Sequence, residues 1–160
     1  MDQIRLFRWL KAVMIGTGIC GALIYFAAFP FLGRDITAAY PEFRSWYWPW
    51  LSFLWLTAIP CCAALVIGWK IVAEIGRDHF FCIENIQRFR ILSFLAGTDS
   101  VLVLIGNIVF LLLNMNHPGV LLFALLIVFT GFALAVVFAA LSHLVLNEVK
   151  PSLKGKPFRL

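Results

Sequence analysis

Charged residues are scarce in this chain of 160 residues: only 13% are Asp, Glu, Lys or Arg, whereas soluble domains carry about 25%. Hydrophobic residues make up 62% of the chain, and the mean hydropathy is +0.95. So few charges could not cover the outside of a water-soluble fold that held this much apolar surface. The sequence therefore predicts a membrane protein, and its length fits a single transmembrane domain over residues 1–160.

The sequence also lacks the residue clusters that carry enzyme or metal chemistry. Its four cysteines show neither metal-ligand spacing nor a disulfide framework, and no nucleophile, base or ligand cluster lies outside the apolar runs. Residues 16–21 match the letters G-x-G-x-x-G, but no strand precedes them and they lie inside an apolar run, so they predict helix packing. We expect a non-enzymatic protein with no catalytic residue, no metal and no cofactor.

Four apolar runs are present, and each is long enough to cross a bilayer. A helix rises ~1.5 Å per residue, so a hydrocarbon core of ~30 Å needs about 20 residues. The first run exceeds a signal-peptide core and has no A-x-A cleavage site, so we expect it to be retained. The expected spans are residues 12–33, 49–70, 91–113 and 120–147, separated by a polar connection at 34–48, a cytoplasmic segment at 71–90 and a tight turn at 114–119, and followed by a basic tail at 148–160. Pro60 should kink the second span, and Pro151 should end the last helix.

The positions of Lys and Arg predict the orientation. Eleven of them lie in the N-terminal stretch, the central segment and the tail, and only Arg34 and Arg44 lie on the other side of the spans. Cytoplasmic loops carry the excess of Lys and Arg. The sequence therefore predicts an all-α membrane protein, an antiparallel bundle of four transmembrane helices with both termini cytoplasmic. The net charge of +5 follows from this topology and does not indicate direct nucleic acid binding.

Asp99 stands out because it is an acid inside the third span. A carboxylate near mid-bilayer costs ~2.5–3.5 kcal/mol, so its side chain should face other helices or water. We expect an intramembrane polar site of Asp99, Asn107 and His143, with Ser142 as a further partner on the last helix. Two interpretations stay open: a proton or cation site, and a hydrogen bond between helices made by a carboxyl that stays protonated.

The central segment carries the one family-like motif, Phe81 to Ile91, FCIENIQRFRI. Its aromatic and basic residues predict a helix lying at the membrane surface that leads into the third span, and Glu84 and Arg88 are spaced to form an i,i+4 pair. The motif resembles the signature F-[ST]-x-E-N-aliphatic-x-x-[LF]-R-aliphatic of the YoaS-like family, which are small bacterial four-helix membrane proteins with a domain of unknown function. Cys82 departs from the Ser or Thr of that signature, and a thiol is a poor N-cap.

The resemblance implies a bacterial plasma membrane protein with a cytoplasmic partner, since a small helix-turn-helix regulator is often encoded beside family members. The residues that would bind such a partner are Phe81, Glu84, Asn85, Arg88 and Arg90. We expect a sensor, regulator or accessory subunit that acts through residues 74–92 and the basic tail; the lipid bilayer, another membrane subunit or a second copy of the chain are further expected partners. The alternative function is a small transporter or channel component that uses Asp99.

Overall fold

The structure is a computed structural model, and it describes residues 3–76, 81–114 and 118–154. These residues are almost entirely helical. In chain order the elements are α1 (Gln3–Leu23), the π-helix η1 (Ile24–Ala28), α2 (Phe29–Ala39), the 3-10 helix η2 (Pro41–Trp46), α3 (Tyr47–Ile75), α4 (Ile83–Leu112) and α5 (Pro118–Lys154). Four helical stretches are long and apolar enough to cross a membrane, namely Phe7–Ala39, Pro41–Ile75, Ile83–Leu112 and Gly119–Lys150. The predicted all-helical, four-span class is confirmed.

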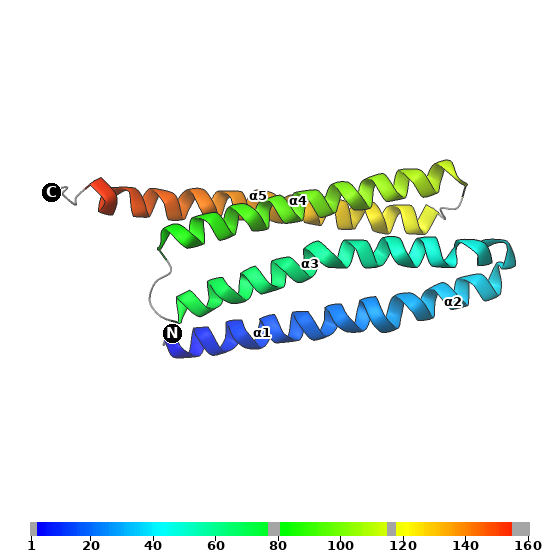
Figure 1. Cartoon of the computed structure of the whole chain (residues 1–160), viewed down its shortest axis with the longest axis horizontal. Coiled ribbons are helices and arrows are strands. Elements are labelled where there is room, and N and C mark those ends of the chain that lie inside the picture. The colour runs from blue at the N-terminus through cyan, green and yellow to red at the C-terminus, as the bar shows by residue number, and fades with distance from the viewer. Residues whose placement is uncertain (1–2, 77–80, 115–117, 155–160) are drawn as a thin grey trace.

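The four long helical stretches lie side by side and alternate in direction (Figure 1). Within the described ranges each stretch packs against its neighbours in the chain: α1 against α3, α3 against α4, and α4 against α5. We call the end that holds the start of α1 and the end of α5 the terminal end, and the opposite end the loop end (Figure 1). The helices therefore follow one another in space in the same order as in the sequence.

The helices are longer than the predicted spans. The predicted connection at 34–48 is itself helical, because α2 runs to Ala39 and η2 continues from Pro41 to Trp46. The last helix does not stop at Pro151: α5 continues to Lys154, so that prediction was wrong. Residues 115–117 of the predicted turn at 114–119 and residues 155–160 of the predicted tail lie outside the described residues.

The described end of the central segment is not a separate helix. The helix that contains the motif begins at Ile83, and it continues without a break into the span as α4. Cys82 is its N-cap residue and makes no side-chain capping hydrogen bond, as expected for a thiol. Ile86 and Phe89, two apolar residues of the motif, are buried against neighbouring helices because their helix face points inward.

The best-packed part of the molecule is its terminal end. Apolar side chains of α3, α4 and α5 meet there and form one buried cluster: Ile71, Ile86, Phe89, Leu92, Val145 and Val149. The first span contrasts with this region, since none of the side chains in its most apolar window is buried. In a membrane such a surface faces lipid chains or a further helix, and neither carries a hydrophobic penalty.

Two prolines interrupt the helical hydrogen bonding of the first hairpin. Pro60 lies inside α3, and the helix bends near its middle (Figure 1), as predicted for a proline that leaves the carbonyl four residues earlier unpaired. Pro30 follows η1, where the N–H of Phe29 donates to the carbonyl of Ile24, five residues back. Because Pro30 has no N–H, the carbonyl of Tyr25 receives no helical hydrogen bond from either Phe29 or Pro30. The indole Nε1 of Trp55 donates to that carbonyl at 3.4 Å.

Candidate functional site

A small polar cluster lies among the apolar helices where η1, α3 and α4 meet. The hydroxyl of Tyr25 lies 3.2 Å from Oγ1 of Thr57 and 4.0 Å from Sγ of Cys61. The thiol of Cys61 donates to Oδ2 of Asp99 at 3.7 Å. The cluster therefore links three successive helical stretches through side chains only.

The direction of hydrogen bonding in this cluster follows from its donors. Thr57 donates its one hydroxyl hydrogen to the carbonyl of Leu54 at 2.8 Å. The hydroxyl of Tyr25 must then be the donor to Thr57. Thr57 and Cys61 are four residues apart on α3, so they lie on the same helix face and meet the first span together.

Asp99 is only partly satisfied in this cluster. Its Oδ1 is buried and has no hydrogen-bond partner among the described residues, while Oδ2 accepts only the weak thiol donor of Cys61. A buried polar atom without a partner is costly, and more so in the membrane interior. The carboxyl of Asp99 therefore has the capacity to take up one further polar partner or a proton.

The predicted partners of Asp99 do not meet it. The hydroxyl of Ser142 donates to the backbone carbonyl of Ile86 at 3.1 Å, close to the terminal end. His143, the next residue on α5, is exposed. The rotation of α5 turns the imidazole outward, so the predicted site of Asp99, Asn107 and His143 is not assembled in this structure.

Asn107 lies elsewhere, beside a cavity between α4 and α5. The cavity has a volume of about 120 Å³, and apolar side chains such as Leu104, Leu121 and Val128 make up the rest of its lining. Asn107 is on the same helix as Asp99 but eight residues further on, hence about 12 Å away along the axis. It belongs to the α4–α5 packing and not to the polar cluster.

A second polar cluster joins the helices at the terminal end, and it contains two residues of the family-like motif. Asn85 is completely buried, and its side-chain oxygen accepts a hydrogen bond from Nη1 of Arg88 at 2.8 Å. The same Nη1 lies 3.6 Å from a carboxylate oxygen of Glu74 near the end of α3. Arg88 thus pairs with Glu74 across the two helices and not with Glu84 as predicted.

The three other predicted partner-binding residues stay on the surface at this end. Phe81 is 62% exposed, and Glu84 and Arg90 are exposed as well. Of the five predicted partner-binding residues, the structure therefore buries Asn85, half-buries Arg88, and leaves the other three accessible. The motif has one inward face that holds helices together and one outward face.

Three residues of the polar cluster, Tyr25, Thr57 and Cys61, were not predicted from the sequence. Cys61 lies between apolar residues in the sequence, and nothing beside it marks it as part of a polar site. The one available signal was the spacing of Thr57 and Cys61 on one helix face, opposite an acid in another span. Among the described residues, no three His, Cys, Asp or Glu side chains are grouped so that they could hold a metal ion.

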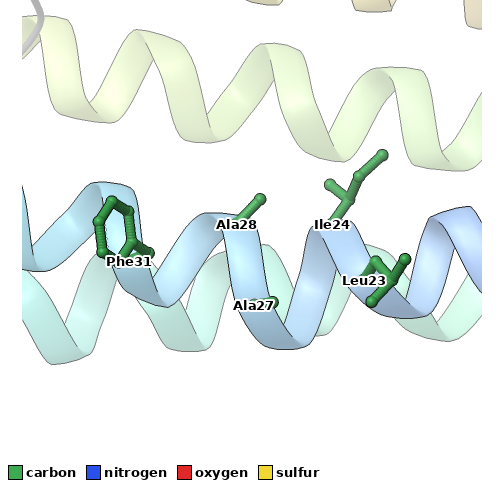
Figure 2. Close-up of a pocket in the computed structure, with 5 residues that line it drawn as sticks. All are labelled: Leu23, Ile24, Ala27, Ala28 and Phe31. Atoms are coloured by element: carbon green, nitrogen blue, oxygen red, sulfur yellow. The ribbon is translucent and has the colours of Figure 1, made fainter.

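An open groove of about 440 Å³ runs along the first span, outside both clusters. It is lined only by apolar side chains, which Figure 2 shows along one stretch of helix: Leu23, Ile24, Ala27, Ala28 and Phe31. Such a lining offers no hydrogen bond or charge to fix a polar ligand. It suits hydrocarbon chains.

Comparison with known proteins gives one family and no close relative. No curated protein and no solved structure matches the chain. Residues 31–150 match the family described as "Protein of unknown function (DUF2975)". This range contains α3, α4, Asp99 and the polar cluster of Glu74, Asn85 and Arg88, whereas Tyr25 lies before it. The chain therefore belongs to the DUF2975 family of proteins of unknown function.

Proposed function

We propose that this chain is a non-enzymatic, multi-pass protein of a bacterial plasma membrane, and that it acts as a sensor, regulator or accessory subunit. It would act through the terminal end of its helices, which would face the cytoplasm. The whole chain would form one transmembrane domain, a bundle of four helices of the YoaS-like kind. The observation that carries this proposal is the two-sided motif at the start of α4.

The two faces of the motif support a regulatory role because they lie on the same helical turns. Asn85 and Arg88 hold α4 against α3, while Glu84 and Arg90 are exposed one or two residues away. A protein that bound the outward face would act directly on the turns that fix the helix packing. Binding at the surface and rearrangement in the membrane would then be coupled, as a regulator requires.

The proposed orientation rests on the distribution of charge and has its own test. Single cysteines at positions 44 and 90, in a chain without its native cysteines, would be treated with a membrane-impermeant thiol reagent in intact cells. We expect labelling at position 44 and protection at position 90 until the cells are opened. Labelling of position 90 in intact cells would reverse the orientation and remove the basis for a cytoplasmic partner.

Site-specific photocrosslinking tests the proposed partner surface. A photoreactive amino acid at position 84 or 90 should crosslink this chain to a second protein in native membranes. Both side chains are exposed beside the contact between α3 and α4. The matched control is position 44, which is exposed at the loop end. Absence of an adduct at both positions, or an equal adduct at position 44, would reject a partner at the terminal end.

A second candidate function is transport or conduction through the membrane, and the unpartnered Oδ1 of Asp99 favours it. A buried acid that lacks a partner is suited to take up a proton or cation. The protein in liposomes with an internal pH-sensitive dye would then carry a proton flux that Asp99→Asn abolishes. Asp35→Asn, at an exposed acid near the loop end, is the control. If the parent protein carries no flux, this candidate is rejected.

A further inference from the structure

The two ends of the molecule differ strongly in charge. At the terminal end, seven Lys and Arg with described side chains face only three acids, Glu74, Glu84 and Glu148. At the loop end, Arg34 and Arg44 are balanced by Asp35 and Glu42. The terminal end therefore attracts anions, and the loop end does not.

Lys11 lies where α1 passes the end of α3, and two further cations lie close to this contact in the sequence. Nζ of Lys11 lies 4.3 Å from the ring centre of Phe7 and 5.5 Å from that of Trp69. Lys70 follows Trp69 directly, and Arg8 lies three residues before Lys11, one turn nearer the end of α1. Lys11 thus bridges the two helices by contact with a ring from each.

These three cations have no acidic partner within the described part of the chain. The one acid on the neighbouring stretch of α3, Glu74, lies beside Arg88 of α4 instead. Arg8 and Lys70 are exposed, and Lys11 is half-buried. An anion placed at this end of α1 and α3 would be attracted by all three positive charges, with no acid of the described residues paired to them.

Close packing keeps this arrangement in place. A Cβ at Gly76 would lie 2.6 Å from the ring of Phe7, and a Cβ at Gly68 would lie 2.9 Å from the methyl group of Met14. Glycines at these two positions let α1 approach α3 on both sides of Lys11. The part of α1 that carries Lys11 is therefore packed closely against α3.

We propose that Arg8, Lys11 and Lys70 form a binding site for the phosphate headgroup of an anionic phospholipid, at the groove between α1 and α3 on the terminal end. The cations would contact the phosphate, with Lys11 as the deepest of the three in the membrane. The site goes beyond the proposed regulatory function, and it needs no protein partner.

The surroundings of the site fit a phospholipid better than a protein or a soluble anion. Trp9 is 68% exposed and Trp69 is 41% exposed, and indole rings at a helix end settle at the level of the headgroups. Towards the membrane centre, Val13 is 61% and Val66 is 58% exposed, so apolar surface continues directly from the cations. A molecule with a phosphate joined to acyl chains matches this order of polar and apolar groups.

Native mass spectrometry of the purified full chain in a nonionic detergent tests the site. Phosphatidylglycerol and phosphatidylcholine with identical acyl chains would be titrated separately. We expect tighter binding of phosphatidylglycerol, and a loss of about fivefold in its affinity for each of Arg8→Gln and Lys11→Gln, since one cation near a lipid surface contributes on that order. Lys11→Arg keeps the charge and should keep most of the affinity.

The control variants are Arg34→Gln and Arg44→Gln, which remove the same charge at the loop end and should leave lipid binding unchanged. Lys70→Gln changes an exposed residue and serves if a substitution at Lys11 disturbs folding. Equal binding of the two lipids by the parent protein would overturn the proposal. An equal loss in the loop-end variants would also overturn it, because the effect would then be one of net charge.

Discussion

Sγ of Cys61 on α3 lies 3.7 Å from Oδ2 of Asp99 on α4, and this contact is the only hydrogen bond that Asp99 receives from another helix in the described part of the chain. Both residues lie within spans of low polarity, where a polar contact has no water to compete with it. The contact joins the two hairpins, since α3 belongs to the first and α4 to the second. A change in how the two hairpins pack would therefore lengthen or break this hydrogen bond.

Cys61→Ala should destabilise the protein, because it leaves both oxygens of Asp99 without a donor. Hydrogen bonds between membrane helices contribute ~0.6 kcal/mol on average and up to ~1.7 kcal/mol, so we expect a loss in that range. Cys62→Ala is the matched control, because this neighbouring thiol is exposed. Unfolding in mixed micelles of increasing SDS content measures both variants, and equal losses would show that the contact with Asp99 contributes nothing.

Ser142→Ala should weaken the packing of α5 on the start of α4. Its hydroxyl donates to the carbonyl of Ile86 at 3.1 Å, and the residue is buried. We expect a loss of ~0.6 kcal/mol or more by the same unfolding measurement. His143→Ala should change stability by less than about 0.5 kcal/mol because the imidazole is exposed. A larger loss of stability for His143→Ala than for Ser142→Ala would contradict this packing and would support the predicted site around Asp99 and His143.

Asn85→Leu should lower the stability of the protein more than Cys61→Ala or Ser142→Ala, because Asn85 is completely buried. The substitution removes the oxygen that accepts from Arg88 and leaves part of a charged group without its partner, at a cost of about 1–3 kcal/mol. Gln87→Leu provides the control at an exposed position of the same helix. A stable Asn85→Leu protein would mean that the motif is not needed for helix packing at the terminal end.

Gly106→Ala should disturb the contact between α3 and α4 near the loop end. The added methyl group would overlap the ring of Phe53, and such overpacking costs about 1–3 kcal/mol. At Gly16 an added methyl group meets no atom within 4 Å. Gly16→Ala should therefore leave stability unchanged or raise it by up to about 1 kcal/mol, since alanine favours the helix. Thermal unfolding of both variants in the same detergent compares the two sites, and a Gly106→Ala protein as stable as Gly16→Ala would contradict the packing.

The number and the approximate positions of the spans could be predicted from the sequence because they depend on hydropathy summed over about twenty residues. The kink at Pro60 could be predicted for a similar reason, since proline lacks an N–H wherever it occurs. The helix ends were less predictable. The polar letters at 34–48 suggested a loop, but α2 and η2 continue through them as helix.

The partners of Asp99 show what sequence alone could not supply. Ser142 and His143 were sound candidates by depth, but depth does not fix how each helix is rotated about its axis. That rotation is set by the packing of many side chains together, such as the cluster around Phe89 and Val145. It turns Ser142 towards Ile86 and His143 outward, and it leaves Cys61 of α3 as the neighbour of Asp99.

Composition by itself determined that this chain belongs in a membrane, because a surface with so few charges has no stable arrangement in water. Only the tertiary structure decided which polar side chains meet, because small rotations of neighbouring helices move a side chain from contact to exposure. The motif at the start of α4 illustrates the difference. Its sequence was sufficient to recognise a family-like pattern, but only the packing of the helices shows that Asn85 is buried and that Glu84 and Arg90 are accessible.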